Sequence, residues 1–68
     1  MVMKIRVNGE WKIVQEHITL EQFLMEEQYP ILKIAVECSG KIVPKAEYAL
    51  RPLQEGDRIE VVRFVGGG

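Results

Sequence analysis

The chain has 68 residues and a mass of 7.8 kDa, which is enough for a single small domain over residues 1–68. Such a thin core has little room for a deep catalytic pocket, so the length favours a carrier or binding module over a self-sufficient enzyme. With 47% apolar residues, 28% charged residues and a formal net charge of -1, the composition excludes disorder and lacks the basic excess of a nucleic-acid-binding protein.

The chain opens with the pattern of a β-hairpin. Apolar and charged side chains alternate over residues 3–7, which predicts a half-buried strand, and residues 11–16 form the return strand. Asn8-Gly9 between them is a strong hairpin signal. A two-residue loop would set apolar residues opposite charged ones, whereas a three-residue loop pairs Val7 with Trp11. We expect the three-residue loop, because one face of the hairpin should be buried.

A short helix follows the hairpin. Thr19 is a good N-cap, and Gln22 completes a capping box with it. The apolar stripe of this helix consists of Leu20, Phe23 and Leu24. Tyr29-Pro30 is expected to end the helix, because the residue before a proline is driven out of the α region.

A second strand pair follows the helix. Residues 33–38 read as a strand, Ser39-Gly40 as a turn, and residues 41–43 as a short return strand. Residues 45–53 lack a clean period. A single helical turn is expected at residues 45–48, and the anchors of this segment in the core are expected to be Leu50 and Leu53.

The last strand runs from Arg58 to Phe64, after a tight turn over residues 54–57. Its apolar residues occur at both parities, which suits a central strand. A hairpin, a crossover helix and a final strand beside the first predict an α+β architecture of the β-grasp (ubiquitin-like) type, with a mixed sheet and one main helix packed on one face.

The sequence also indicates in which compartment the protein resides and whether it binds a metal. Apolar runs reach only three residues, so no membrane span or signal segment is expected, and the protein should be cytoplasmic. A single cysteine, Cys38, excludes an internal disulfide and is expected to be a small buried hydrophobe. With a single histidine, His17, it cannot build a structural zinc site, so no metal is expected.

The glycines at residues 66–68 are not explained by folding, because they contribute no packing and lose much entropy when ordered. A frayed end is the plain interpretation. In the functional interpretation, the carboxylate of Gly68 is the reacting group, activated by another enzyme as an acyl-adenylate. The flexible tail, residues 65–68, would span about 13–14 Å when extended.

Four stretches carry a resemblance that covers the whole chain. They are Ile34-Ala-Val-Glu37, Gly40-Lys-Ile-Val-Pro44, Leu53-Gln-Glu-Gly-Asp57 and Arg58-Ile-Glu-Val-Val-Arg-Phe-Val-Gly-Gly-Gly68, whose ending Phe64-Val-Gly-Gly-Gly68 is the most specific. With these motifs the chain resembles the ThiS family, the sulfur carriers of thiamine biosynthesis. It departs from the common family pattern at Cys38-Ser39, which touches only a turn.

The resemblance implies a carrier acted on by partner enzymes, with no catalytic residue and no bound cofactor of its own. A ThiF-like adenylating enzyme would consume ATP to activate Gly68, and a sulfur donor such as a cysteine desulfurase system would convert it to a thiocarboxylate. A thiazole synthase (ThiG-like) would receive the sulfur for the thiazole ring. Gly66 and Gly67 would thread the tail into partner active sites, and Arg63, Phe64 and Val65 are the expected partner interface.

Three other functions stay open from the residues alone. The chain could serve as a sulfur carrier like the small subunit of molybdopterin synthase, as a ubiquitin-like modifier ligated through Gly68, or as a plain interaction module. Trp11 is interpreted either as a sheet-face packing residue or as an interface anchor. His17 is expected to be a polar loop residue, and Glu21, Glu26 and Glu27 a solvated helix face.

Overall fold

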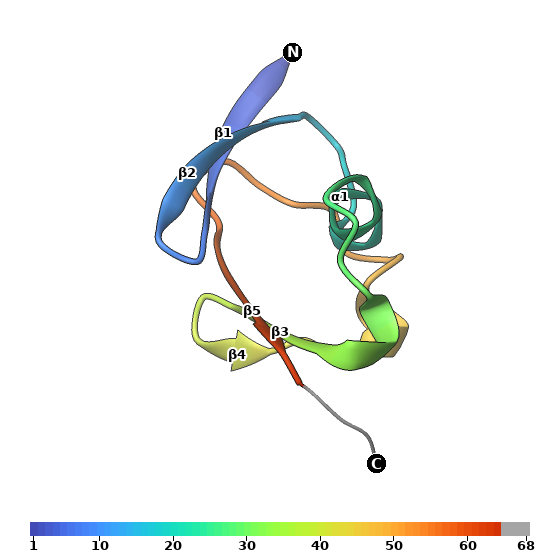
Figure 1. Ribbon diagram of the computed structural model, residues 1–68. Coiled ribbons are helices and arrows are strands. Elements are labelled where there is room, and N and C mark those ends of the chain that lie inside the picture. Colours follow the sequence, from blue (N-terminus) through green and yellow to red (C-terminus); the bar gives the residue numbers. More distant parts are fainter. Residues whose placement is uncertain (65–68) are drawn as a thin grey trace.

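The sheet and its single helix account for the architecture of residues 1–64, which are the residues that the computed structural model describes (Figure 1). The strands are β1 (Val2–Val7), β2 (Glu10–Gln15), β3 (Ile34–Cys38), β4 (Lys41–Ile42) and β5 (Arg58–Arg63). The helical elements are α1 (Leu20–Glu26) and the 3₁₀ turns η1 (Ile31–Lys33) and η2 (Lys45–Glu47). The strand order β2-β1-β5-β3-β4 and the position of α1 confirm the predicted α+β, β-grasp fold.

Strand β5 lies at the centre of the sheet, as its sequence predicts. It runs parallel to β1, with Arg6 opposite Arg58, and antiparallel to β3, with Val36 opposite Val61. Pairing with β1 holds only the start of β5, Arg58 and Ile59, whereas pairing with β3 extends to Arg63 and holds its C-terminal end. Within residues 1–64 no helix is long and apolar enough to cross a membrane.

One apolar cluster between α1 and the sheet forms the core. Its fully buried members are Ile5, Leu20, Phe23, Leu24, Ile34, Val36, Tyr48 and Ile59. The three buried helix residues are the predicted apolar stripe of α1. We call the opposite side of the sheet, which α1 does not cover, the outer face.

The hairpin loop has two residues, so the predicted three-residue register is wrong. Val7 lies opposite Glu10, and Trp11 lies opposite Arg6. Asn8 and Gly9 both have positive φ angles, 51° and 85°, as in a type I′ turn. The twist of this turn matches the twist of paired strands, and this local geometry prevails over the matching of apolar residues. Trp11 is therefore on the outer face, 56% exposed.

Asn8 also ties the hairpin to the central strand. Its side-chain Oδ1 accepts a hydrogen bond from the Val61 N–H at 2.8 Å, and its own N–H donates to the Ile59 carbonyl at 2.9 Å. Asn8→Ala should lose about 1–3 kcal/mol of unfolding free energy, because it leaves the Val61 N–H without its acceptor and places alanine at a positive φ. Urea denaturation measures this loss.

Ser39→Ala is the matched control for the turn. Ser39 has a φ of 52°, and its side chain makes no hydrogen bond among the described residues. We expect this variant to lose only about 0.5 kcal/mol. An equal loss in the two variants would contradict the role assigned to the Asn8–Val61 hydrogen bond.

Helix α1 begins as predicted but ends earlier than predicted. The capping box is present: the Gln22 N–H donates to Thr19 Oγ1 at 3.1 Å, and the Thr19 N–H donates to Gln22 Oε1 at 2.9 Å. At the other end, Gln28 adopts a φ of 62° and its N–H donates to the Met25 carbonyl at 3.0 Å. The helix therefore stops at Glu26 in a Schellman motif. The prediction that Tyr29-Pro30 ends it is wrong.

The segment before β5 contributes Tyr48 and Leu53 to the core. Leu53 is buried as predicted, but Leu50 is 78% exposed and was wrongly expected to be an anchor. The predicted helical turn is present as η2, and Tyr48, which follows it, turns inward and is only 1% exposed. The Tyr48 carbonyl accepts a hydrogen bond from the Glu21 N–H at 2.9 Å, which ties the segment to the start of α1.

Burial raises the pKa of the Tyr48 phenol above its ordinary value of 10.0. The unfolded chain therefore loses this proton at a lower pH than the folded chain. The neutral, buried phenol therefore makes its full contribution to the free energy of unfolding below pH 10.0. This contribution is lost as the pH rises through the pKa that Tyr48 has in the folded chain. We expect the melting temperature of the wild type to fall more steeply above pH 10.0 than that of Tyr48→Phe. Identical alkaline slopes would contradict this expectation.

Candidate functional site

The C-terminal end of β5 is the base of the candidate site. The Phe64 N–H donates to the Lys33 carbonyl at 2.9 Å, which continues the pairing with β3 one residue beyond the strand. The Phe64 ring is half exposed, and the Lys45 ammonium lies 5.8 Å from its centroid. The same ammonium donates to the Ile34 carbonyl at 2.9 Å. Backbone and side chain therefore both fix the direction in which Phe64 leaves the sheet.

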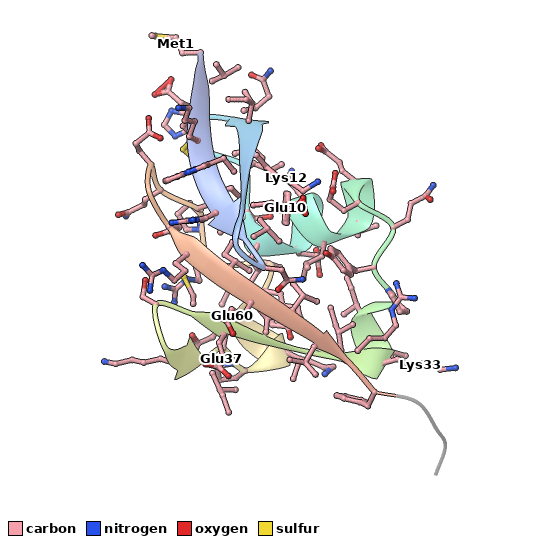
Figure 2. The ribbon with its side chains drawn as sticks, turned by 60° about the vertical axis from the view of Figure 1, so that its left-hand side comes forward. Met1, Glu10, Lys12, Lys33, Glu37 and Glu60 are labelled. Atoms are coloured by element: carbon pink, nitrogen blue, oxygen red, sulfur yellow. The ribbon has the colours of Figure 1, made fainter. Side chains whose placement is uncertain are left out.

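Positive charge surrounds this base. Lys33, Lys45 and Arg63 are all exposed there, and Figure 2 shows Lys33 beside the end of β5. None of the three forms an ion pair within residues 1–64. The base of the site is therefore suited to a partner surface that carries carboxylates.

The structure describes the predicted site residues only as far as Phe64. Arg63 lies opposite Ile34 at the end of β5, and Phe64 extends the strand. Val65, Gly66, Gly67 and Gly68 lie outside the described residues. The structure thus places the part of the expected partner interface from which the glycine segment continues.

Large apolar side chains are exposed on the outer face, beyond those that sequence reasoning selected. They are Val2, Trp11, Ile13, Ile42, Val62 and Phe64. Phe64 was expected to contact partners and Trp11 was one candidate for an interface anchor, but the others were not expected. A period-2 reading of the strands in the correct register finds them, because they alternate with buried or inward-facing residues.

Trp11 is part of this face and does not pack in the core. Arg6 lies 5.1 Å and Lys4 lies 5.7 Å from the centroid of its ring. These cations cover part of the indole and leave more than half of the side chain exposed. The exposure of Trp11 meets the condition for the second interpretation, an interface anchor, which stays a prediction.

The remaining polar candidates have structural roles or lie apart. Cys38 is 3% exposed and packs in the core, as predicted. His17 is exposed in the turn after β2. Glu27 pairs with Lys12 at 3.0 Å, and this hydrogen bond raises the pKa of Lys12. Both side chains are exposed to water, so the pair adds little stability. Within residues 1–64, no three potential metal ligands gather at one place.

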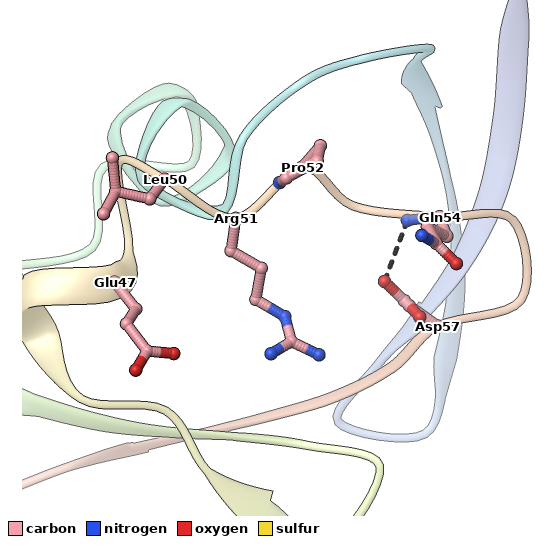
Figure 3. A pocket seen from close by; sticks show the side chains of 6 residues that line it. All are labelled: Glu47, Leu50, Arg51, Pro52, Gln54 and Asp57. Atoms are coloured by element: carbon pink, nitrogen blue, oxygen red, sulfur yellow. Dashed lines mark hydrogen bonds between the residues drawn. The ribbon is translucent and has the colours of Figure 1, made fainter.

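An open hollow of about 500 Å³ lies between η2 and the turn before β5 (Figure 3). Its lining residues are Glu47, Leu50, Arg51, Pro52, Gln54 and Asp57. The Asp57 carboxylate accepts a hydrogen bond from the Gln54 N–H at 2.8 Å, so it closes the turn before β5. None of these lining residues is one of the predicted site residues.

A mixed sheet with one helix on one face and a central strand directly before a glycine segment in the sequence defines a β-grasp domain. The ThiS family model matches residues 5–68, which includes the whole glycine segment. A crystal structure of the thiamine biosynthesis protein ThiS from Geobacter metallireducens superposes with a TM-score of 0.82 at 25% identity, covering 97% of this chain and 100% of that chain. The chain therefore belongs to the ThiS family. These matches support the predicted ThiS-like sulfur carrier.

Two longer proteins are also similar to the chain. The thiazole synthases of Paramagnetospirillum magneticum and Magnetococcus marinus are 41% and 44% identical over 66 residues, which is 97% of this chain. The chain spans only 20% of the length of each of these proteins. A segment like this chain therefore occurs within proteins that bear the name of a thiazole synthase.

Proposed function

We propose that the chain carries sulfur for the thiazole ring of thiamine as a thiocarboxylate on Gly68. The observation that supports this most is the family match, which runs through residue 68. The described end of β5 agrees with it, since Phe64 is anchored to β3 and lies directly before the segment that must reach an enzyme. Gly68 is the sulfur-bearing residue, and Gly66 and Gly67 let the chain pass a narrow channel because they have no Cβ.

The chemistry needs activation, because a carboxylate is a poor electrophile. A ThiF-like enzyme transfers AMP from ATP to the Gly68 carboxylate and releases pyrophosphate. The outer sulfur of a persulfide, supplied by a donor such as a cysteine desulfurase system, then attacks the acyl carbon and displaces AMP to form an acyl disulfide. A thiol reductant cleaves the S–S bond of this acyl disulfide, which releases the thiocarboxylate and leaves the donor sulfur in a disulfide with the thiol. This chain contributes the acyl group and a recognition surface, while the partner enzymes contribute the catalysis.

The expected acceptor of the sulfur is a thiazole synthase. Proteins with that name contain a segment 41–44% identical to this chain, which favours a functional link between the two. The resemblance to ThiS proteins of known structure points to the same biosynthetic route. ATP is consumed by the activating enzyme, so the chain itself needs no cofactor.

Formation of the acyl-adenylate tests the first step. The chain is incubated with the activating enzyme and ATP, then quenched with hydroxylamine, which converts an acyl-adenylate to a hydroxamate. We expect a hydroxamate at Gly68 that depends on both ATP and the enzyme. A hydroxamate at another residue, or none while a different carrier is adenylated by the same enzyme, would contradict the proposal.

A further inference from the structure

Two pairs of like charges face each other across the strands of the outer face. Arg6 on β1 lies opposite Arg58 on β5, and Glu37 on β3 lies opposite Glu60 on β5. Figure 2 shows Glu37 and Glu60 side by side on neighbouring strands. Within residues 1–64 none of the four forms an ion pair.

Such pairs weaken a sheet, because like charges on directly opposite residues repel each other. Neither pair is needed to complete the core, since all four side chains alternate with core-facing residues and project from the outer face. Arg6 has two compensating contacts: its position 5.1 Å from the Trp11 ring, and the hydrogen bond that its Nε–H donates to the Gly9 carbonyl at 3.4 Å. Within residues 1–64 no ion pair compensates the glutamate pair. The arrangement is therefore costly for the isolated chain and calls for opposite charges from outside it.

The charges also follow an order along β5. From Phe64 backwards, the outer face carries apolar Val62, then Glu60, then Arg58. The apolar part thus lies beside the base of the glycine segment, the acidic pair comes next, and the basic pair lies furthest away. Along β5 itself this order runs in one direction, so a partner strip that contacts β5 matches it in one orientation. Docking on this face would present the glycine segment to the partner in one direction.

We propose that the Glu37–Glu60 and Arg6–Arg58 pairs select and orient a thiazole synthase that docks on the outer face. The matching surface of that enzyme carries basic side chains against Glu37 and Glu60, acidic side chains against Arg6 and Arg58, and an apolar patch against Val62 and Phe64. This inference rests on the proposed function. A thiazole synthase is chosen as the occupant because similar segments occur within proteins of that name.

The variant Glu37→Lys tests separately how the acidic pair affects the stability of the fold and how it affects binding to the partner. It turns the acidic pair into an attractive Lys–Glu pair, so the melting temperature should rise by about 1–5 °C. It also places a cation against the basic side chains of the partner. The dissociation constant for the thiazole synthase of the same organism should therefore weaken by about tenfold at low salt, and by less at high salt.

Glu26→Lys is the matched control, because it makes the same change of charge on the exposed side of α1, away from the outer face. We expect its dissociation constant to stay within about twofold of the wild type. Glu37→Gln, which removes the repulsion without reversing the charge, should lie between wild type and Glu37→Lys in binding. Isothermal titration calorimetry and thermal melts followed by circular dichroism supply the two readouts.

The outcomes distinguish this inference from the proposed function. Equal binding of Glu37→Lys and Glu26→Lys would overturn the inference, as would a melting temperature of Glu37→Lys no higher than that of the wild type. A change confined to self-association of the chain would overturn it as well. If the wild type accepts sulfur but does not bind the synthase, the inference alone fails. If it neither binds nor accepts sulfur, both proposals fail.

Discussion

Deletion of Gly67 and Gly68 should abolish sulfur acceptance and leave the fold intact. The variant still ends in a carboxylate, on Gly66, but this group is withdrawn by about 7 Å, the span of two extended residues. An adenylating site that takes the end of a chain through a channel cannot reach it. The buried core lies between Met3 and Ile59, so the melting temperature should not change. Mass spectrometry after incubation with enzyme, ATP and sulfur donor measures the loss.

A chain of full length with an amide at the C-terminus of Gly68 is the control for this deletion. The amide removes the reacting oxygen without shortening the chain, so it should also accept no sulfur. It should still bind the activating enzyme about as tightly as the wild type, because the outer face and the glycines are unchanged. Sulfur on the deleted chain would show that the reacting group is elsewhere.

Phe23→Ala should unfold the domain at room temperature. Phe23 is 1% exposed and packs between α1 and the sheet. Loss of a buried phenylalanine ring costs about 3–5 kcal/mol. A domain of this size seldom has more than about 3–5 kcal/mol of stability in total. Circular dichroism should therefore show the loss of the cooperative thermal transition.

Met25→Ala is the matched control on the same helix. Met25 is 62% exposed, so its removal leaves no cavity, and the change in stability should stay within about 0.5 kcal/mol. A cooperative melt for Phe23→Ala within about 5 °C of the wild type would contradict the account of the core.

The fold could be predicted from the sequence where one local signal acted alone. The capping box of Thr19 and Gln22 marked the start of α1, and the apolar residues of β5 at both parities marked its central place. The Ser39-Gly40 turn was recognised for the same reason, since both residues have positive φ angles in the structure. In each case residues adjacent in sequence supply the deciding contact.

Predictions failed where two effects competed. In the first hairpin, the Asn8-Gly9 turn favoured a two-residue loop and the apolar pattern favoured a longer one, and the turn geometry prevailed. The end of α1 was assigned to Pro30, but Gln28 closes the helix earlier through backbone hydrogen bonds that its residue type does not signal. Leu50 was expected to be a core anchor together with Leu53, but it is exposed, and Tyr48, which directly follows η2, packs inward.

The ThiS family could be predicted from the sequence, whereas the arrangement of charges on the outer face could not. The ending Phe64-Val-Gly-Gly-Gly68 is the most specific motif of the resemblance, and the family model matches residues 5–68. The outer face depends on which residues lie opposite each other on β1, β3 and β5, which are far apart in the chain. No local pattern pairs Glu37 with Glu60. Only the strand order and register bring the two carboxylates together.

The intact mass of the chain after incubation with ATP, a sulfur donor and the activating enzyme tests the central claim most directly. We predict a gain equal to the replacement of one carboxylate oxygen by sulfur, which fragmentation assigns to Gly68. The gain should require ATP and the enzyme. An unchanged mass, with the enzyme active on another carrier, would contradict the account of the chain as a thiocarboxylate carrier.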